Sequence, residues 1–131
     1  MKNIAYYLIP KSNVAFLYDD FTVRQGIEKM RFHGYAAIPV ITRDGKYVCS
    51  VCEGDFLKYV LSDEYRENEG YSPLRSILTP GNNPPVRITE SIDDLLDHAC
   101  NQNFIPVIDD SDIFVGIVTR RAIITSLVKN K

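Results

Sequence analysis

The stretch Gly34-Tyr35-Ala36-Ala37-Ile38-Pro39-Val40-Ile41 decides the fold of this 131-residue chain, because a closely related stretch occurs a second time. The second copy reads Asn103-Phe104-Ile105-Pro106-Val107-Ile108, so the tetrapeptide Ile-Pro-Val-Ile recurs unchanged 67 residues later. Only two copies are present, and their period is longer than that of a solenoid repeat. The sequence therefore predicts two half-domains that face each other and share a core, since each half alone would bury little surface.

Both copies carry the same order of signals. An amphipathic helix precedes the apolar strand with its proline, and a turn and a second apolar strand then run directly into another helix. Because Pro39 and Pro106 cannot donate to a sheet ladder, we expect each at a strand start or on an edge strand. The predicted fold class is mixed α/β (α+β). Each half has the order β-α-β-β-α, and a pseudo-two-fold axis relates the halves, with strands inside and helices outside.

Local signals predict where helices begin. Asn3 caps a short helix that Pro10 stops, the Thr22-x-x-Gln25 capping box opens the first repeat helix, and Ser91 caps its counterpart. Gly26 within the first repeat helix indicates either a close neighbour, such as another helix, or an unoptimised surface position.

Four segments follow from these signals. We expect an N-terminal helix at 1–10, a first half at 11–62, a linker at 63–80 and a second half at 81–131. Within the linker, residues 62–71 are polar and predict a connector, and residues 73–78 predict one helical turn.

The composition narrows the partners and the location. The formal net charge of −2 argues against a nucleic-acid partner or an anionic membrane. No apolar run approaches the roughly 18 residues needed to span a bilayer. The N-terminal apolar stretch, ended by Pro10, is too short for a secretory signal, so we expect a cytoplasmic protein.

Sequence motifs for catalysis and for metal binding are absent. Cys49-x-x-Cys52 superficially matches a redox or zinc half-site. However, residues three apart on a strand point to opposite faces, and no second pair or histidine cluster accompanies them. We therefore expect Cys49, Cys52 and Cys100 to be buried as small hydrophobic residues, with no metal and no cofactor. No nucleophile elbow, P-loop or zinc-protease motif occurs, so the chain is not expected to be an enzyme.

The corner between the last strand and helix of each half is the candidate binding position. A strand that runs straight into a helix presents free N–H groups and the positive end of the helix dipole, which suit phosphate. In the second half this corner reads Thr119-Arg120-Arg121-Ala122, where Thr119 is a good N-cap. Two arginines in a first helical turn oppose the dipole, so we expect either a phosphate or an acidic side chain across a dimer contact beside them. In the first half the corner reads Cys52-Glu53-Gly54-Asp55, where the acids stabilise the helix start without a ligand.

This order of blocks, with the apolar-Pro-Val strand and a Gly-x-x-Thr-x-x-Asp-like corner, resembles the cystathionine-β-synthase (CBS) domain. The tandem resembles a CBS pair of the small free-standing bacterial type over residues 11–127. The resemblance implies a regulatory module that binds an adenosine nucleotide (AMP, ADP or ATP) in the cleft between its two CBS domains and signals to an unknown effector protein. Alternatives are a cyclic di-AMP or S-adenosylmethionine sensor, or a dimerising interaction module with degenerate pockets.

The resemblance also implies particular site residues. In that family the corner hydroxyl contacts the ligand, the Asp three residues later binds the ribose, and the opposite half completes each site. Asp55 matches the ribose Asp of one site, with Cys52 at the hydroxyl position, and the lining residues of this site are Arg87, Asn103, Phe104, Ile105 and Pro106. Thr119 matches the hydroxyl of the other site, whose further residues are Arg120, Arg121, Ala122, Ser12, Val14, Ala36, Ala37, Ile38 and Pro39.

The chain departs from that pattern in both halves. Cys52 stands where Thr or Ser is usual, Ala122 stands where the second Asp would be, and Cys49 replaces the glycine that Gly116 supplies. Each site lacks one of its two polar groups, which implies weak binding at both sites or binding at the Asp55 site alone.

A homodimer is also expected, because short amphipathic helices on so small a body leave apolar area exposed. An isologous two-fold contact is the commonest solution. Gly26 and the apolar faces of the helices that begin at Glu53 and Thr119 are the candidate contacts.

Overall fold

Residues 3–129 are described by the computed structural model, and they form two compact units. One unit is the continuous segment 15–82, and the other combines residues 3–14 with residues 83–129. The outermost residues of the predicted N-terminal and C-terminal segments, 1–2 and 130–131, lie outside the described residues.

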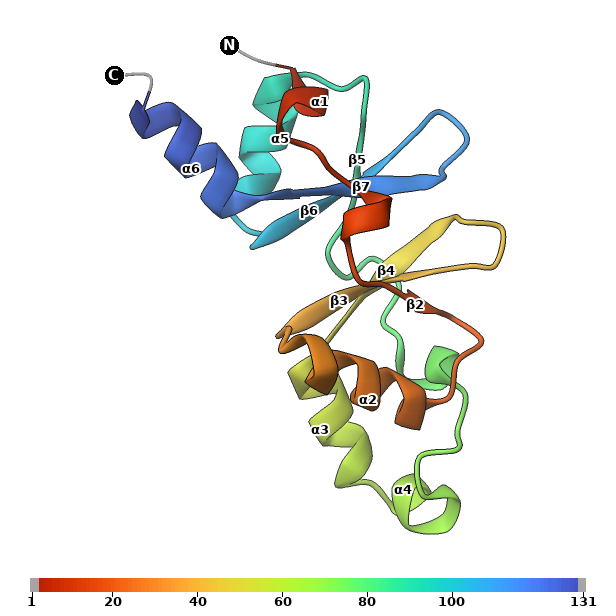
Figure 1. Ribbon diagram of the computed structural model, residues 1–131. Helices are drawn as coiled ribbons and strands as arrows, with labels where there is room; N and C mark the ends of the chain where they lie inside the picture. Colours follow the sequence, from red (N-terminus) through yellow and green to blue (C-terminus); the bar gives the residue numbers. More distant parts are fainter. Residues whose placement is uncertain (1–2, 130–131) are drawn as a thin grey trace. The chain divides into compact units, whose positions relative to one another are not determined.

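The continuous unit contains one complete repeat. Its elements are β2 (Leu17–Tyr18), α2 (Val23–His33), β3 (Ala37–Ile41), β4 (Tyr47–Cys52) and α3 (Glu53–Val60), followed by α4 (Asp63–Asn68) and η2 (Leu74–Ile77). The sheet has the order β2-β3-β4, in which β2 runs parallel and β4 antiparallel to β3. Helices α2 and α3 lie on the same face of this sheet (Figure 1), and their apolar side chains form the core with it.

The discontinuous unit contains the second repeat and the N-terminal segment. Its elements are α1 (Ile4–Tyr7), β1 (Ile9–Pro10), η1 (Lys11–Asn13), β5 (Val86–Arg87), α5 (Ile92–Ala99), β6 (Phe104–Ile108), β7 (Phe114–Thr119) and α6 (Arg120–Lys129). The sheet order is β1-β7-β6-β5. Ile4 and Tyr7 of α1 belong to the core of this unit, together with residues of α5, β6, β7 and α6.

The predicted duplication and the mixed α+β class are confirmed. Both repeats have the order β-α-β-β-α, and their strands pair in the same register. Ala37 lies opposite Cys52 as Phe104 lies opposite Thr119, and each ladder shifts register at the same repeat position.

The prediction for the two prolines is wrong. Pro39 and Pro106 lie in the middle of β3 and β6, which are inner strands of their sheets. A proline is tolerated there because the parallel neighbour has only two residues and pairs only with the residues after the proline. No ladder partner therefore requires the missing N–H.

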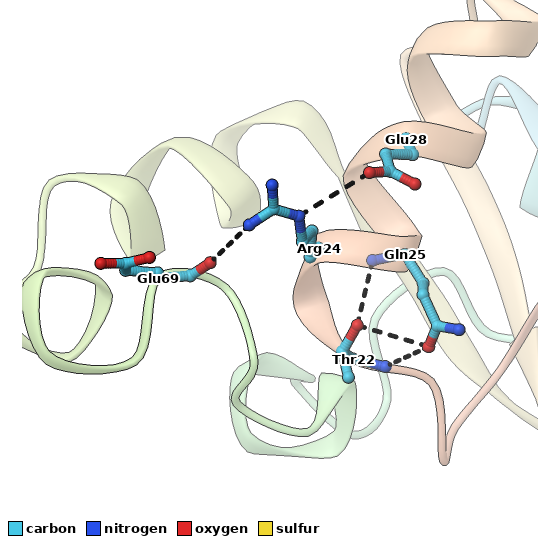
Figure 2. A network of polar contacts seen from close by, with 5 residues as sticks. All are labelled: Thr22, Arg24, Gln25, Glu28 and Glu69. Atoms are coloured by element: carbon cyan, nitrogen blue, oxygen red, sulfur yellow. Dashed lines mark hydrogen bonds and ion pairs between the residues drawn. The ribbon is translucent and has the colours of Figure 1, made fainter.

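The predicted helix caps are confirmed. Asn3 Oδ1 accepts a hydrogen bond from Tyr6 N, and Ser91 Oγ accepts one from Asp94 N, both at 3.1 Å. Thr22 and Gln25 form the reciprocal capping box of α2 (Figure 2). Side chains thus satisfy N–H groups that a helix start leaves without partners.

The segment between the repeats also caps α2. Val23 N donates to the carbonyl of Ser72 over 2.9 Å, and Arg24 N donates to that of Gly70 over 2.8 Å. The Arg24 guanidinium reaches the carbonyl of Glu69 (Figure 2). The sequence predicted a polar connector at 62–71, but the structure has helix α4 there, capped by Ser62. The single turn predicted at 73–78 is confirmed as η2.

Gly26 has the close neighbour that its position indicated. A Cβ at Gly26 would lie 3.1 Å from Cζ of Phe56, so the glycine lets α3 approach α2. Gly26 is buried, and the expectation that it forms a dimer contact is therefore wrong, because Phe56 already covers it.

The glycine that differs between the repeats also has a packing reason. β1 pairs antiparallel with β7, placing Pro10 opposite Gly116. A Cβ on Gly116 would overlap the carbonyl oxygen of Ile9 and lie 2.9 Å from Cδ1 of Leu8. In the continuous unit β4 is an edge strand that pairs with β3 alone, and no strand takes the place of β1 beside Cys49, so a side chain is accommodated there.

Candidate functional site

One backbone contact builds the strand-to-helix corner of both repeats. Glu53 N donates to the carbonyl of Ala36 over 3.0 Å, and Arg120 N donates to that of Asn103 over 2.9 Å. The donors are 67 residues apart, as are the acceptors. The first residue of α3 or α6 is thereby fixed beside the start of the preceding β3 or β6 strand, which brings the candidate residues of each unit to one place.

In the first corner, Asp55 and Cys52 bind each other. Asp55 Oδ2 accepts a hydrogen bond from Cys52 N at 2.9 Å and another from Cys52 Sγ at 3.2 Å. The thiol thus takes the place of a corner hydroxyl, and the carboxylate closes the first turn of α3. Asp55 Oδ1 accepts no hydrogen bond from any residue between 3 and 129, and the side chain is half-buried. One carboxylate oxygen therefore has a structural role, and the other can accept a hydrogen bond from a ligand.

The cysteines differ in environment. Cys49 is fully buried, and burial together with the negative charge of Asp55 raises the pKa of its thiol to about 11. The expectation of a buried thiol is confirmed for Cys49 but wrong for Cys100, which is exposed at the C-cap of α5. Cys52 is half-buried.

No cluster of His, Cys, Asp and Glu that could hold a metal ion occurs within residues 3–129. Over the same range, every helix is too short or too polar to cross a membrane.

In the second corner, the two arginines have different surroundings. Thr119 Oγ1 accepts a hydrogen bond from Ala122 N at 3.1 Å, which confirms its N-cap role. Arg120 Nε donates to the carbonyl of Ala99 over 2.7 Å. The C-terminal end of α5 is thus one negative group beside Arg120, and the phosphate or the acidic side chain across a dimer contact stays a prediction.

Arg121 is exposed and, among the described residues, has neither a hydrogen-bond nor an ion-pair partner. It lies between two depressions of the discontinuous unit, with volumes of about 390 and 680 Å³. Thr119 and Thr125 also line both. Residues lining only the smaller one are Asn103, Arg120 and Ile124, and those lining only the larger one are Tyr6, Tyr7, Ala122, Ser126 and Lys129. Arg121 is the cation available to an anionic ligand at this corner.

The candidate strand residues fall into two groups. Ala36 and Asn103 are exposed, and Ala37 and Phe104 are half-buried. The remaining residues, Ile38, Pro39, Ile105 and Pro106, are buried. The Ile38 and Ile105 side chains belong to the cores of their units.

Three further candidates lie elsewhere in the discontinuous unit. The Arg87 guanidinium donates to the carbonyl of Asp109 over 2.9 Å and to Asp112 Oδ1 over 2.7 Å. Ser12 is exposed in η1 and Val14 follows it, with η1 beside β7. Each expected site combines residues of both units, and these combinations stay predictions.

Sequence reasoning missed the larger depression. It lies between α1 and α6, and Tyr6, Tyr7, Thr125, Ser126 and Lys129 had not been singled out. A comparison of the repeats contains the signal, because Ser126 occupies the position of Tyr59, 67 residues earlier.

The sequence matches a known domain family twice. The CBS domain model matches residues 6–62 and residues 74–129, which together cover most of the chain. Among curated proteins, none matches this sequence.

Solved structures share the fold. CbpB in complex with c-di-AMP has a TM-score of 0.88 and 23% identity, covering 98% of this chain and 85% of that one. A hypothetical conserved protein from Geobacillus kaustophilus has a TM-score of 0.88 and 23% identity, covering 99% and 98%. CBSX2 in complex with AMP has a TM-score of 0.78 and 18% identity, covering 98% of each chain. At these identities the likeness concerns the fold.

Proposed function

Because the chain belongs to the CBS domain family and carries two copies of the domain, we propose that it is a regulatory module that binds an adenosine nucleotide. In this proposal the module acts on an effector protein and catalyses no reaction itself. A nucleotide ligand is consistent with a cytoplasmic location.

The observation that carries this proposal is the repeated strand-to-helix corner. At one corner a carboxylate oxygen of Asp55, and at the other the guanidinium of Arg121, has no hydrogen-bond partner among the described residues. A carboxylate suits the vicinal hydroxyls of ribose, and a guanidinium beside the N-terminus of α6 suits phosphate. Asp55 is assigned to the ribose of a ligand at the first corner, and Arg121, with Thr119, to the phosphate of a ligand at the second corner.

The fold neighbours support the ligand class. Two of them were crystallised with adenine-containing nucleotides, one with c-di-AMP and one with AMP. We therefore keep AMP, ADP and ATP as the first candidates, with c-di-AMP and S-adenosylmethionine as alternatives.

A thermal-shift series tests the ligand class. The protein is heated with AMP, ADP, ATP, c-di-AMP or S-adenosylmethionine, each at 1 mM. A ligand present at about 100 times its Kd adds about 2.7 kcal/mol to the free energy of unfolding. We expect a rise in Tm with at least one adenine compound and none with uridine monophosphate. No rise with any of them would favour the dimerising interaction module instead.

The homodimer remains part of this proposal, with a second copy of the chain as the occupant of an apolar surface. Each repeat exposes three apolar side chains at matching positions 67 residues apart. They are Leu57, Val60 and Leu61 on α3 and its C-cap, and Ile124, Leu127 and Val128 on α6. Leu61 is 71% and Val128 68% exposed, so each unit leaves the same surface uncovered. The duplication of this surface suits an isologous contact, in which both copies use the same patch.

Sedimentation tests the dimer. Wild type is expected to sediment as a dimer at micromolar concentration, whereas Leu61→Glu combined with Val128→Glu gives a monomer, because a charge replaces apolar contact area. Asn68→Glu on α4 is the control and leaves the dimer intact. A wild-type monomer would contradict the proposal.

A further inference from the structure

The groove between α1 and α6 lies at a position where the two repeats differ. In the continuous unit, Tyr59 of α3 is 4% exposed, and its hydroxyl donates to Ser72 Oγ over 2.8 Å. In the other unit the matching residue is Ser126, whose Oγ lies 3.4 Å from the hydroxyl of Tyr7. In the tyrosine–serine contact, α3 thus carries the tyrosine, whereas α6 carries the serine. A serine occupies much less volume than the tyrosine at the matching position, and the depression of about 680 Å³ lies beside it.

The lining of this groove is cationic and hydroxylic. Arg121, Thr125 and Lys129 follow one another at intervals of four residues, so they form one stripe along α6. The eight residue steps from Arg121 to Lys129 correspond to about 12 Å along the helix axis. Neither cation has an ion-pair partner between residues 3 and 129, and none of the described residues that line the groove carries a carboxylate.

The residue that breaks the family pattern also lies in this groove. Ala122 is half-buried in the wall, at the position where the first repeat carries Asp55. A carboxylate there would stand beside Arg121 and would repel an anion. With alanine at this position, the described residues that line the groove carry no negative charge.

We propose that this groove binds a chain of phosphate groups, such as the diphosphate or triphosphate of a nucleotide. Arg121 and Thr119 hold the phosphate nearest the corner, and Thr125, Ser126 and Lys129 hold the phosphates further along α6. The inference rests on the proposed nucleotide-binding function and adds that the second repeat recognises the phosphate chain rather than the ribose. ATP therefore binds more tightly than AMP.

Calorimetric titration with inorganic tripolyphosphate tests the groove without any adenosine. Tripolyphosphate is expected to bind the wild type, with an affinity that falls as the salt concentration rises. Arg121→Gln and Lys129→Gln each weaken binding about tenfold. Ser126→Tyr, which gives α6 the tyrosine that α3 carries at the matching position 59, abolishes binding. Lys58→Gln, the loss of an exposed lysine from α3, leaves the affinity unchanged. Circular dichroism verifies that each variant is folded, and the two glutamine variants keep the test valid if Ser126→Tyr does not fold.

The nucleotide series separates this inference from the proposed function. We expect ATP to bind about tenfold more tightly than AMP in wild type and equally in Lys129→Gln. Binding of AMP without binding of tripolyphosphate would overturn the phosphate groove and leave the proposed function intact. Binding of tripolyphosphate without binding of any adenine compound would support the groove and overturn the adenosine assignment.

Discussion

Arg120 donates a hydrogen bond of 2.7 Å from Nε to the carbonyl oxygen of Ala99, and this contact separates its role from that of the adjacent Arg121. Arg120 closes the C-terminal end of α5, where a cation interacts favourably with the helix dipole. Arg121 makes no such contact with the described residues. One arginine of the pair is structural and the other is available for binding.

Arg120→Gln should lower the free energy of unfolding by about 1.5–3 kcal/mol, because a charge-assisted hydrogen bond is lost. Arg121→Gln should stay within about 0.5 kcal/mol of wild type, as is usual for an exposed residue without partners. Urea unfolding of both variants checks this. The interpretation of Arg120 fails if the two variants are equally stable.

Substitution of Asp55 should separate its two functions. Asp55→Asn keeps an oxygen that can accept from Cys52 N, so it costs little stability but removes the charge. Asp55→Ala also loses the cap, which costs about 0.5–2 kcal/mol. Both should weaken adenosine nucleotide binding about ten- to a hundredfold, as expected for a lost charge-assisted hydrogen bond. Calorimetric titration with AMP measures it, and wild-type affinity in both variants would refute the ribose assignment.

Introducing an aspartate at position 122, which matches Asp55 of the first repeat, should have opposite effects on the binding of AMP and of tripolyphosphate. Ala122→Asp supplies the missing carboxylate beside Thr119, so AMP binding should strengthen. The same charge should weaken tripolyphosphate binding, because like charges repel. Titration of this variant with both ligands is the measurement. Unchanged affinities would show that position 122 faces neither ligand.

Gly116→Ala should destabilise the protein by at least about 1–3 kcal/mol, the usual range when an inserted carbon forces the backbone to shift. The new Cβ would overlap the carbonyl oxygen of Ile9 and displace β1 from β7. Gly54→Ala is the matched control, since its new Cβ would meet only Cys52 Sγ at 3.9 Å and alanine favours a helix. Denaturant unfolding compares them, and equal stabilities would contradict the close approach of β1.

Burial of Cys49 should make stability fall in alkaline solution. In the unfolded chain the thiol has its ordinary pKa of 9.0, whereas in the folded protein the pKa is raised to about 11. Between these values the unfolded chain binds fewer protons, so the free energy of unfolding falls as pH rises. The loss approaches roughly 2–3 kcal/mol for a difference of two units. Unfolding of wild type and Cys49→Ala from pH 8 to 11 measures it, and an identical pH dependence would contradict the prediction.

Sequence reasoning recovered the features of the fold that depend on local signals. The repeated Ile-Pro-Val-Ile, the capping box of Thr22 and Gln25 and the caps at Asn3 and Ser91 all act over a few residues. Features that depend on a partner far away in the sequence could not be predicted from local patterns. The positions of Pro39 and Pro106 depend on how short the neighbouring strands are, which no pattern around the prolines reports.

The candidate site likewise has features that local sequence predicts and features that depend on distant residues. The cap at Thr119 and the acids of α3 follow from local chemistry, and the structure contains both. The binding partner of Arg120 lies on α5, 21 residues away, so the arginine pair could not be resolved from its neighbours in sequence. The depression beside α6 depends on α1, more than 100 residues earlier, and only a comparison of Ser126 with Tyr59 points to it.

The pairing of β1 with β7 determines the order in which the two units can form on the ribosome. Residues 15–82 are continuous, so their sheet and core can assemble as soon as this segment has emerged. Residues 9 and 10 must wait until residues 116 and 117 have been synthesised before they can pair, although they emerge first. Closing a loop of that length is slow relative to local structure. The unit that contains α6 and its groove is therefore the last to become complete, and the surface proposed to bind phosphate forms only after α6 has been made.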